Sequence, residues 1–336
     1  MNSKIEKLSR GFIFNDVEPD FLEEELNLGF GWKLRKATPE EISHKQVLFR
    51  LGSYAQLRGH RHGYPPVLQD VKKISKTHTY NAPPKTLDEL REVARLSVAE
   101  SNGNPEINHH YLKLALAISD AELHIGTFFD SDYNGNTSSW WEFLGFRINS
   151  SRMMDGELHL DRPSKQNIPD ILETVNHMAK VPCQEVMNSI NLFMSLNQFP
   201  DDTPMKHLGY FTVIESLLSH APTPNDRADS IMRQLQRNLV LIDHRLQEVG
   251  KSLGFNNFGE QSPKNILKNL YSYRSCIAHG SDSSEALVKI ERTVQDWDVW
   301  GKEFGTFVWV GHWLRRLARR VLFAAIREPQ LIVDLK

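Results

Sequence analysis

Hydrophobic residues recur at helical spacing through most of the second half of the chain, from about Ile168 onward. The predicted helices cover residues 168–181, 183–199, 205–220, 225–253, 262–280, 283–300 and 313–326. The longest has an apolar stripe made of Ala228, Ile231 or Met232, Leu235, Leu239, Ile242, Leu246 and Val249. Proline and glycine fall between these segments, where helices should end. The pattern therefore predicts an antiparallel helical bundle.

The first half of the chain mixes helical and strand-like patterns. Its predicted helices cover residues 37–49, 87–100 and 109–121. Thr38 and Glu41 form a capping box for the first, and Thr86 and Glu89 repeat that device for the second. The third is predicted from its apolar spacing alone.

Short β-branched and aromatic runs between and after these helices predict strands. Residues 122–129 and 140–149 are two such runs, and the turn-forming pair Asn134-Gly135 lies between them. This order is typical of a β-hairpin. Residues 156–163 could add another strand.

The predicted fold is an α+β domain over residues 1–165, followed by an all-α helical bundle over residues 166–336. A chain of 336 residues is long enough for two domains. Its hydrophobic and charged fractions, 40% and 24%, are those of an ordinary globular protein. The formal net charge is −2, so any nucleic-acid-binding surface must be local rather than a property of the whole chain.

The sequence carries no pattern for export or membrane insertion. Residues 1–14 lack the apolar run of a signal peptide, and no apolar segment approaches the roughly 18–20 residues that span a bilayer. Only two cysteines occur, Cys183 and Cys276, so no disulfide framework is expected. We expect a cytoplasmic, thiol-reduced protein without a membrane partner.

Arg274 and His279 lie five residues apart at the end of the helix predicted over residues 262–280. On a straight helix such positions point roughly 140° apart. The two side chains come closer if the helix ends at Ala278 or His279, with Gly280 as a left-handed cap.

An arginine and a histidine at such a position could cleave RNA without a metal. The negative end of the helix dipole favours the protonated form of His279, which can then exchange protons near neutral pH. The guanidinium of Arg274 can bind phosphate oxygens and stabilise charge that develops on phosphorus. Cationic residues that merely cap a helix end are the structural alternative.

Glu215 falls within the apolar stripe of the helix predicted over residues 205–220. An acid on the core face of a helix is costly unless it is paired and hydrogen-bonded. Arg274 is the predicted partner, and the pair would hold the guanidinium in place. The alternative is that Glu215 lies at the edge of the stripe and reaches water.

Two segments together resemble the HEPN superfamily, specifically its Apea-like branch. YFTVIESLLSH, residues 210–220, is similar to the branch's helix with a glutamate followed by small and leucine residues. NLYSYRSCIAHGSDSS, residues 269–284, is similar to its Y-x-x-R-S-x-x-x-H-G motif. A long amphipathic helix between them also fits, and the resemblance covers about residues 168–327.

The resemblance implies a bundle of about five helices that dimerises and cuts RNA without a metal or other cofactor. Active members are often toxins or effectors of antiviral and abortive-infection systems. Arg274 and His279 would be the catalytic pair, with Glu215, Ser275 and Tyr271 in support. Many members have Asn or Asp where this chain has Ser275, and serine is usual in the Apea-like branch.

The expected partners are RNA, with tRNA one candidate, and a second copy of the chain. A protein or phage-derived trigger could engage residues 1–165, which would then act as a sensor or recruitment module. Some family members are inactive. The alternative is therefore a non-catalytic HEPN-like dimeric interaction or nucleotide-binding module, in which Arg274 and Glu215 form a structural ion pair.

The last predicted helix carries a row of arginines, Arg315, Arg316, Arg319 and Arg320. The row could be an RNA-backbone track, a solvated helix face or a strip of salt bridges between subunits. Four nearby tryptophans are expected to be core or interface anchors: Trp297, Trp300, Trp309 and Trp313.

No metal site is expected. Asp130, Asp132, Asn134 and Gly135 match the start of a calcium loop, but its twelfth position is Trp141, so a hairpin turn explains the segment better. Four histidines, His60, His62, His109 and His110, lack a third ligand at zinc spacing.

Overall fold

The computed structural model describes residues 9–13, 25–36, 97–101, 109–119, 123, 125–129, 162–180, 182–199, 203–221 and 230–335. The chain divides into two compact units, residues 1–173 and 174–336. The division falls within helix α6, Arg162–Lys180. The domain boundary predicted from the sequence, after residue 165, lies within the same helix.

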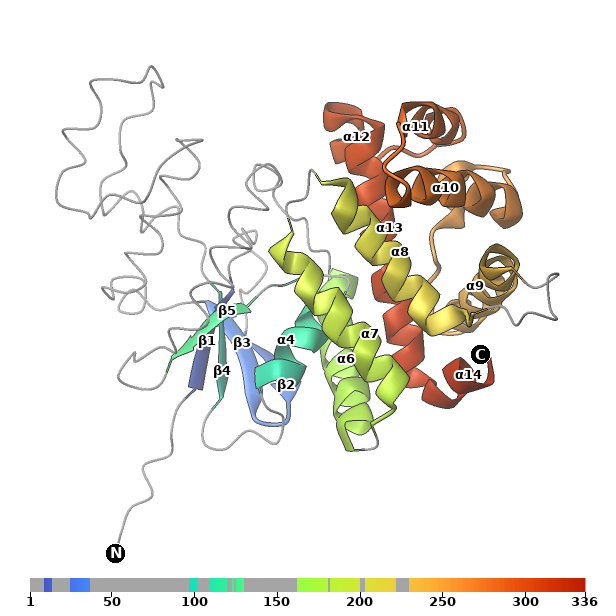
Figure 1. Ribbon diagram of the computed structural model, residues 1–336. Helices are drawn as coiled ribbons and strands as arrows, with labels where there is room; N and C mark the ends of the chain where they lie inside the picture. Colours follow the sequence, from blue (N-terminus) through green and yellow to red (C-terminus); the bar gives the residue numbers. More distant parts are fainter. Residues whose placement is uncertain are drawn as a thin grey trace, which may run out of the picture. The chain divides into compact units, whose positions relative to one another are not determined.

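The first unit contains a five-stranded antiparallel sheet (Figure 1). Its strands are β1 Ser9–Ile13, β2 Leu26–Gly29, β3 Trp32–Lys36, β4 Ser97–Ser101 and β5 Ile125–Phe129. Their order across the sheet is β2-β3-β4-β1-β5. Strand β1 therefore lies between two strands that come much later in the sequence.

A tight turn joins β2 to β3. Its two central residues, Phe30 and Gly31, have φ angles of 52° and 79°, which is the backbone of a two-residue hairpin turn. Trp32 and Leu34 on β3 are buried, with 1% and 0% exposure. Between them, Lys33 pairs with Glu25 at 2.7 Å, so the strand alternates between core and solvent.

Helix α4, His109–Ile118, confirms the third helix predicted in this half of the chain. It buries a continuous run from Leu114 to Ile118 and packs against β5. The ring of Trp32 meets that of His109 at its start, with centroids 5.6 Å apart. This contact ties the hairpin of β2 and β3 to the helix.

One predicted helix in this unit is wrong at its end. Residues 97–100 were expected to complete the helix over 87–100, but they form strand β4. The strand pairs with β1 on one side and β3 on the other, and hydrogen bonds on both edges outweigh a local helical spacing. Residues 37–49 and 86–96 lie outside the described part of the chain.

The predicted strand over residues 122–129 is present as β5, and the described part of the chain pairs it with β1. Its predicted hairpin partner, residues 140–149, and the turn at Asn134 lie outside the described residues. Residues 162–163, expected at the end of a strand, instead begin α6. That helix starts earlier than the predicted residue 168.

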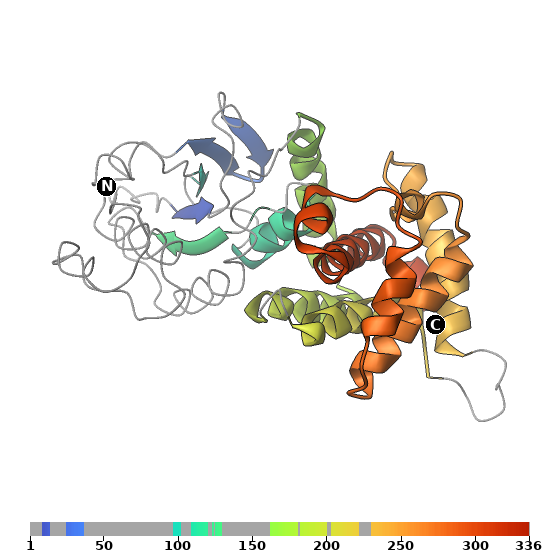
Figure 2. The same ribbon diagram turned by 90° about the horizontal axis from the view of Figure 1, so that it is seen from above.

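Every described regular element after residue 162 is helical (Figure 2). Beyond α6 these are α7 Gln184–Ser195, η3 Leu196–Gln198, α8 Pro204–Leu218, α9 Ile231–Gln247, η4 Phe255–Phe258, α10 Pro263–Ala278, α11 Ser284–Glu291, α12 Val299–Phe304, α13 Thr306–Arg327 and α14 Pro329–Asp334. Helix α8 packs against α7, α9, α10 and α13. Figure 2 views α13 nearly along its axis.

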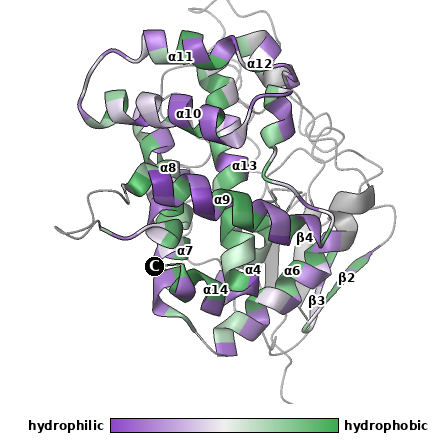
Figure 3. Cartoon of the chain, turned by 90° about the vertical axis from the view of Figure 1, so that its right-hand side faces the viewer, coloured by the Kyte–Doolittle hydropathy of each residue, from purple (hydrophilic) through white to green (hydrophobic). Residues whose placement is uncertain are grey.

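The core of the second unit forms where α13 meets α8 and the η4 segment. Trp309 and Trp313 are each 1% exposed, and both rings meet Phe258 edge-on with centroids 5.3 Å apart. They confirm the expectation of core anchors. Trp297 packs on Trp309 at 5.8 Å. Figure 3 shows hydrophobic and hydrophilic residues on the same helices, as elements with one face in a core require.

The helix predicted over residues 283–300 is two helices, α11 and α12. Residues 292–298 break it because the carbonyl oxygen of Asn257 accepts hydrogen bonds from the backbone of Gln295 and Asp296, at 2.9 and 3.1 Å. The Asp298 carboxylate then caps α12 by accepting from Gly301 N at 2.7 Å. The η4 segment, far away in the sequence, thus supplies the partner that stops the helix.

None of the helices in the described ranges is both long enough and apolar enough to cross a membrane.

Candidate active site

Helix α10 ends where the sequence predicts. Its last residue is Ala278, His279 is the C-cap with φ −97° and ψ 2°, and Gly280 has a φ of 66°. Ser281 N donates to Cys276 O at 2.9 Å, which closes the left-handed turn. The predicted glycine cap is confirmed, and it places His279 at the edge of the helix.

His279 is exposed, and its side chain has no hydrogen-bond or ion-pair partner within the described part of the chain. Its backbone N donates to Ser275 O at 3.1 Å, so Ser275 contacts it through the main chain. The structure therefore does not join His279 to Arg274 within one copy. The imidazole is open to solvent.

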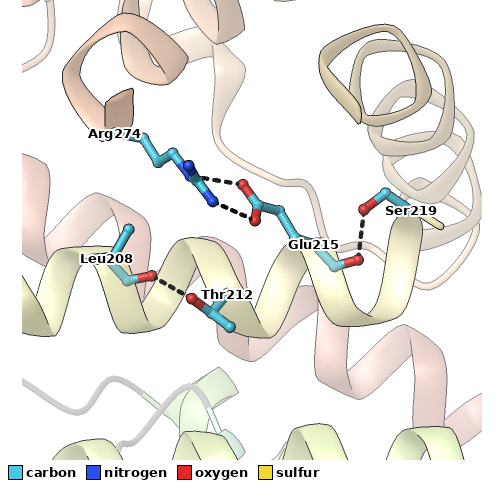
Figure 4. Close-up of polar contacts among 5 residues, drawn as sticks. All are labelled: Leu208, Thr212, Glu215, Ser219 and Arg274. Carbon is cyan, nitrogen blue, oxygen red and sulfur yellow. Dashed lines mark hydrogen bonds and ion pairs between the residues drawn. The ribbon is translucent and has the colours of Figure 1, made fainter. Parts of the chain in front are cut away.

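Glu215 and Arg274 form the ion pair that the sequence predicts (Figure 4). Arg274 Nε donates to Glu215 Oε1 at 3.0 Å, and Nη2 donates to Oε2 at 2.9 Å. The two side chains are 24% and 13% exposed. Glu215 is therefore mostly buried rather than open to water, and a two-bond fork fixes the guanidinium plane.

Tyr271 lies one helical turn before Arg274 and covers the guanidinium. Arg274 Cζ is 5.6 Å from the centroid of the Tyr271 ring, within the range of a cation–π contact. Burial raises the pKa of the Tyr271 phenol, the Glu215 carboxylate adds to that rise, and Arg274 partly opposes it. The phenol therefore stays protonated near neutral pH.

A second polar bridge, which was not predicted from the sequence, joins α8 to α10. His207 Nδ1 lies 2.8 Å from the hydroxyl of Tyr273, and the two residues are 1% and 0% exposed. Burial, with Lys206 and His312 nearby, lowers the pKa of His207 to about 3, and burial raises the pKa of Tyr273. The bridge is therefore neutral.

One sequence signal could have located His207. It lies four residues before Phe211 and seven before Ile214, both of which are buried, so it occupies the apolar face of α8. Its ring stacks on Phe307 with centroids 4.4 Å apart. Nothing local in the sequence points to Tyr273 as its partner.

Side chains of α9 hold the end of α8 that carries Glu215. Asn238 Nδ2 donates to Leu218 O at 2.7 Å, and Gln234 Oε1 accepts from His220 N at 2.8 Å. Both amides are 0% exposed. Ser219 Oγ also donates to Glu215 O at 2.8 Å (Figure 4). These bonds fix the backbone from which Glu215 reaches Arg274.

The arginine row on α13 does not form a continuous solvent-facing track. Arg319 is 3% exposed, which contradicts its prediction as an RNA contact. Arg316 Nη2 donates to Asn257 Oδ1 at 2.9 Å, and Arg320 donates to the carbonyl oxygen of Ser252. Trp313 Nε1 donates to Gly254 O at 3.2 Å in the same loop. Arg316 and Arg320 thus bind the segment before α10, and Arg315 is half-exposed.

No group of three His, Cys, Asp or Glu side chains is arranged to hold a metal ion in the described ranges. His109 and His110 lie at the start of α4, and burial with Lys113 nearby lowers the pKa of His109. His60, His62 and the calcium-like loop from Asp130 lie outside the described residues. Cys183 and Cys276 are both free thiols.

No protein-family model, no curated protein and no solved structure matches the chain.

Proposed function

We propose that the chain is a metal-independent endoribonuclease of the HEPN type. The observation that carries the proposal is the end of α10, where an exposed His279 follows an Arg274 that Glu215 holds by two hydrogen bonds. A proton-transferring imidazole beside a fixed guanidinium suits the cleavage of a phosphodiester. The proposed setting is the cytoplasm, where the protein acts as a toxin or as an effector of antiviral or abortive-infection defence.

Each residue has a separate role in this proposal. His279 accepts the proton of a ribose 2′-hydroxyl, and the 2′-oxygen attacks phosphorus while the bond to the 5′-oxygen breaks. The leaving 5′-oxygen takes a proton from the imidazolium form of His279. The products are therefore a 2′,3′-cyclic phosphate and a 5′-hydroxyl. Arg274 stabilises the charge on the phosphoryl oxygens, and Glu215 and Tyr271 orient its guanidinium.

Two copies of the chain would complete the site. Arg274 is turned toward α8, whereas His279 lies beyond the end of α10, and no contact joins them in one copy. A homodimer that opposes two α10 ends could present both groups to one phosphate. The proposed substrate is RNA, with tRNA a candidate, and a protein or phage-derived trigger would act through the N-terminal unit.

The second candidate is a non-catalytic dimeric interaction or nucleotide-binding module. The fork between Arg274 and Glu215 favours it, because the same bonds tie α8 to α10 as a structural ion pair would. The exposure of His279 favours the nuclease, since a histidine that only supported the fold would be expected to contact another element.

Cleavage of total RNA and of a labelled tRNA pool in EDTA tests the proposal. Wild type should cut and leave 2′,3′-cyclic phosphate ends, and His279→Ala should lower the rate by roughly 10²–10⁴-fold. His244→Ala is the matched control, because His244 is an exposed histidine on α9. Cutting that survives His279→Ala would refute the assignment, and no cutting by any variant would point to a nuclease that needs its trigger or to the interaction module.

A further inference from the structure

The solvent face of α10 carries a row of side chains that extends away from His279. Its members are Lys264, Lys268, Tyr271, Ser275 and His279, here called the α10 track. At 100° per residue they fall within an arc of about 80°. The lysines and His279 are exposed, and Tyr271 and Ser275 are half-buried. Figure 3 shows hydrophilic residues along this helix.

The opposite face of α10 is the one that packs. Ile266, Leu267, Leu270 and Tyr273 are its buried residues, and they point away from the track. On the α9 side, Gln236 Nε2 donates to Lys264 O at 3.1 Å, a contact that uses the main chain and leaves the Lys264 side chain exposed. The track is therefore a surface that the fold does not need for its core.

Charge on α10 is of one sign. Between Pro263 and His279 the sequence contains Lys264, Lys268 and Arg274 and no acidic residue. Of the acids near the helix, Glu215 pairs with Arg274, Asp282 accepts from Ser284 and Glu285 pairs with Lys289 at 2.8 Å, whereas Glu260 lies exposed three residues before Pro263. A chain with net charge −2 thus has a local cationic surface that ends at the proposed catalytic histidine.

We propose that the α10 track binds the backbone of single-stranded RNA that continues from the cleavage site toward the start of α10. The inference rests on the proposed function, because it takes the RNA to be the substrate cut at His279. Lys264 and His279 are separated by roughly 22 Å along the helix, at 1.5 Å per residue. The lysines contact phosphates, and the Tyr271 ring between them and His279 offers a base a stacking surface.

The α10 track, rather than the arginine row on α13, is the RNA-binding surface in this proposal. There the guanidinium groups of Arg316 and Arg320 bind a loop of the chain itself, and Arg319 is buried. On α10, by contrast, the ammonium groups of Lys264 and Lys268 lie on an exposed helix face. Two lysines followed by an aromatic ring suit a single strand better than they suit an acidic peptide, because a peptide of acidic residues offers no base to stack on the ring.

The test measures binding of the full-length protein to a labelled single-stranded RNA of about 12 nucleotides. Every ribose carries a 2′-O-methyl group, so wild type binds the RNA without cutting it. Binding is followed over a series of salt concentrations in EDTA. The variant is Lys264→Gln with Lys268→Gln, and the matched control is Lys180→Gln with Lys302→Gln, two exposed lysines on α6 and α12.

The α10 variant should bind more weakly, and the slope of log affinity against log salt should fall by about 1.4, or 0.7 for each lost phosphate contact. The control should keep the wild-type slope. An unchanged slope in the α10 variant overturns the proposal. Binding of poly-glutamate without binding of the RNA also overturns it, and would indicate a protein partner.

A cleavage assay on unmodified RNA separates this inference from the nuclease. The α10 variant should raise KM and leave kcat near the wild-type value, because its lysines do not touch the reacting atoms. RNA binding that depends on both lysines, without any cutting by wild type, would support the track and refute a nuclease that is active without a trigger. Cutting with unchanged KM in the variant would support the nuclease and refute the track.

Discussion

Two polar bridges join α8 to α10, and they differ in burial and in charge. His207 and Tyr273 form a neutral hydrogen bond with almost no exposure, whereas Glu215 and Arg274 form a charged fork that is 13% and 24% exposed. Tyr273 and Arg274 are neighbours on α10, while their partners are eight residues, or roughly 12 Å, apart on α8. The two bridges therefore fasten the same part of α10 to two separate points along α8.

The difference separates a structural bond from one that is available for chemistry. A buried neutral pair satisfies two polar groups that would otherwise lack a partner, and it offers nothing to a ligand. A part-exposed arginine keeps contact with solvent while its orientation is fixed. Changes to the charged bridge should therefore affect activity, and changes to the neutral bridge should affect stability.

The largest expected effect is on the charged bridge. Arg274→Ala should lower the rate of RNA cleavage by roughly 10²–10³-fold, because it removes the group that stabilises phosphoryl charge. Arg274→Lys should also lose most activity, since an ammonium cannot form the fork with Glu215. Initial rates on labelled RNA measure both, with Arg327→Ala as the exposed-arginine control. Wild-type rates from Arg274→Ala would contradict the assignment.

Removing the hydroxyl of the neutral bridge should act on stability instead. Tyr273→Phe leaves Nδ1 of a buried His207 without its partner, at a cost of about 1–3 kcal/mol in the free energy of unfolding. Urea unfolding measures the loss. Cleavage at saturating RNA, below the unfolding transition, should stay within a few-fold of wild type. A large loss of kcat in a folded Tyr273→Phe would remove the distinction between the bridges.

The neutral bridge also predicts a dependence of stability on pH. The folded pKa of His207, about 3, lies below its ordinary value of 6.5, so the unfolded chain takes up a proton first as pH falls. This contribution to stability is complete above pH 6.5 and declines toward pH 3, by up to about 1.4 kcal/mol per pH unit. His207→Gln does not titrate, so its free energy of unfolding should fall less steeply. Equal slopes would contradict the prediction.

A smaller loss of stability is expected from crowding the same histidine. The Cβ of Gly311→Ala would lie 2.5 Å from His207 Nε2, and the ring cannot move freely because it stacks on Phe307. Overpacking should exceed the gain in helix propensity, for a net loss of about 1 kcal/mol. Thermal unfolding of Gly311→Ala and wild type measures the loss, and an equal or higher melting temperature for the variant would contradict the prediction.

The smallest effect concerns the ring that covers Arg274. Tyr271→Leu removes a cation–π contact worth about 0.5–1 kcal/mol at an exposed site, so cleavage should fall by a few-fold. Tyr271→Phe keeps the ring and should cleave at nearly the wild-type rate. Equal losses in both variants would mean that the phenol hydroxyl, rather than the ring, is what matters.

The parts of the site that the sequence predicted depend on local signals. Ser262 and Pro263 begin α10, and Gly280 ends it, so both limits of the helix can be read within a few residues. The pairing of Glu215 with Arg274 followed from the cost of an unpaired acid on an apolar face. Their direct contact is now observed, while their catalytic roles remain a prediction.

The parts that could not be predicted depend on contacts between distant residues. Strand β4 exists because β1 and β3 pair with it, and the bridge between His207 and Tyr273 spans 66 residues. The burial of Arg319 also has no local signal, since an arginine on an amphipathic helix usually covers the surface with its stem. The carbonyl oxygen of Ser252, 68 residues away in the sequence, accepts a hydrogen bond from Arg320, the residue after Arg319.

The position of His279 depends on the left-handed backbone conformation of Gly280. A Cβ at this position would meet no atom within 4 Å, so volume is no obstacle, yet the φ of 66° is a conformation that L-residues adopt only at a cost of roughly 1–2 kcal/mol. A D-alanine introduced by chemical synthesis would adopt it readily, whereas L-alanine would strain the cap. The left-handed backbone conformation of Gly280, an achiral residue, thus determines where the neighbouring imidazole of His279 lies.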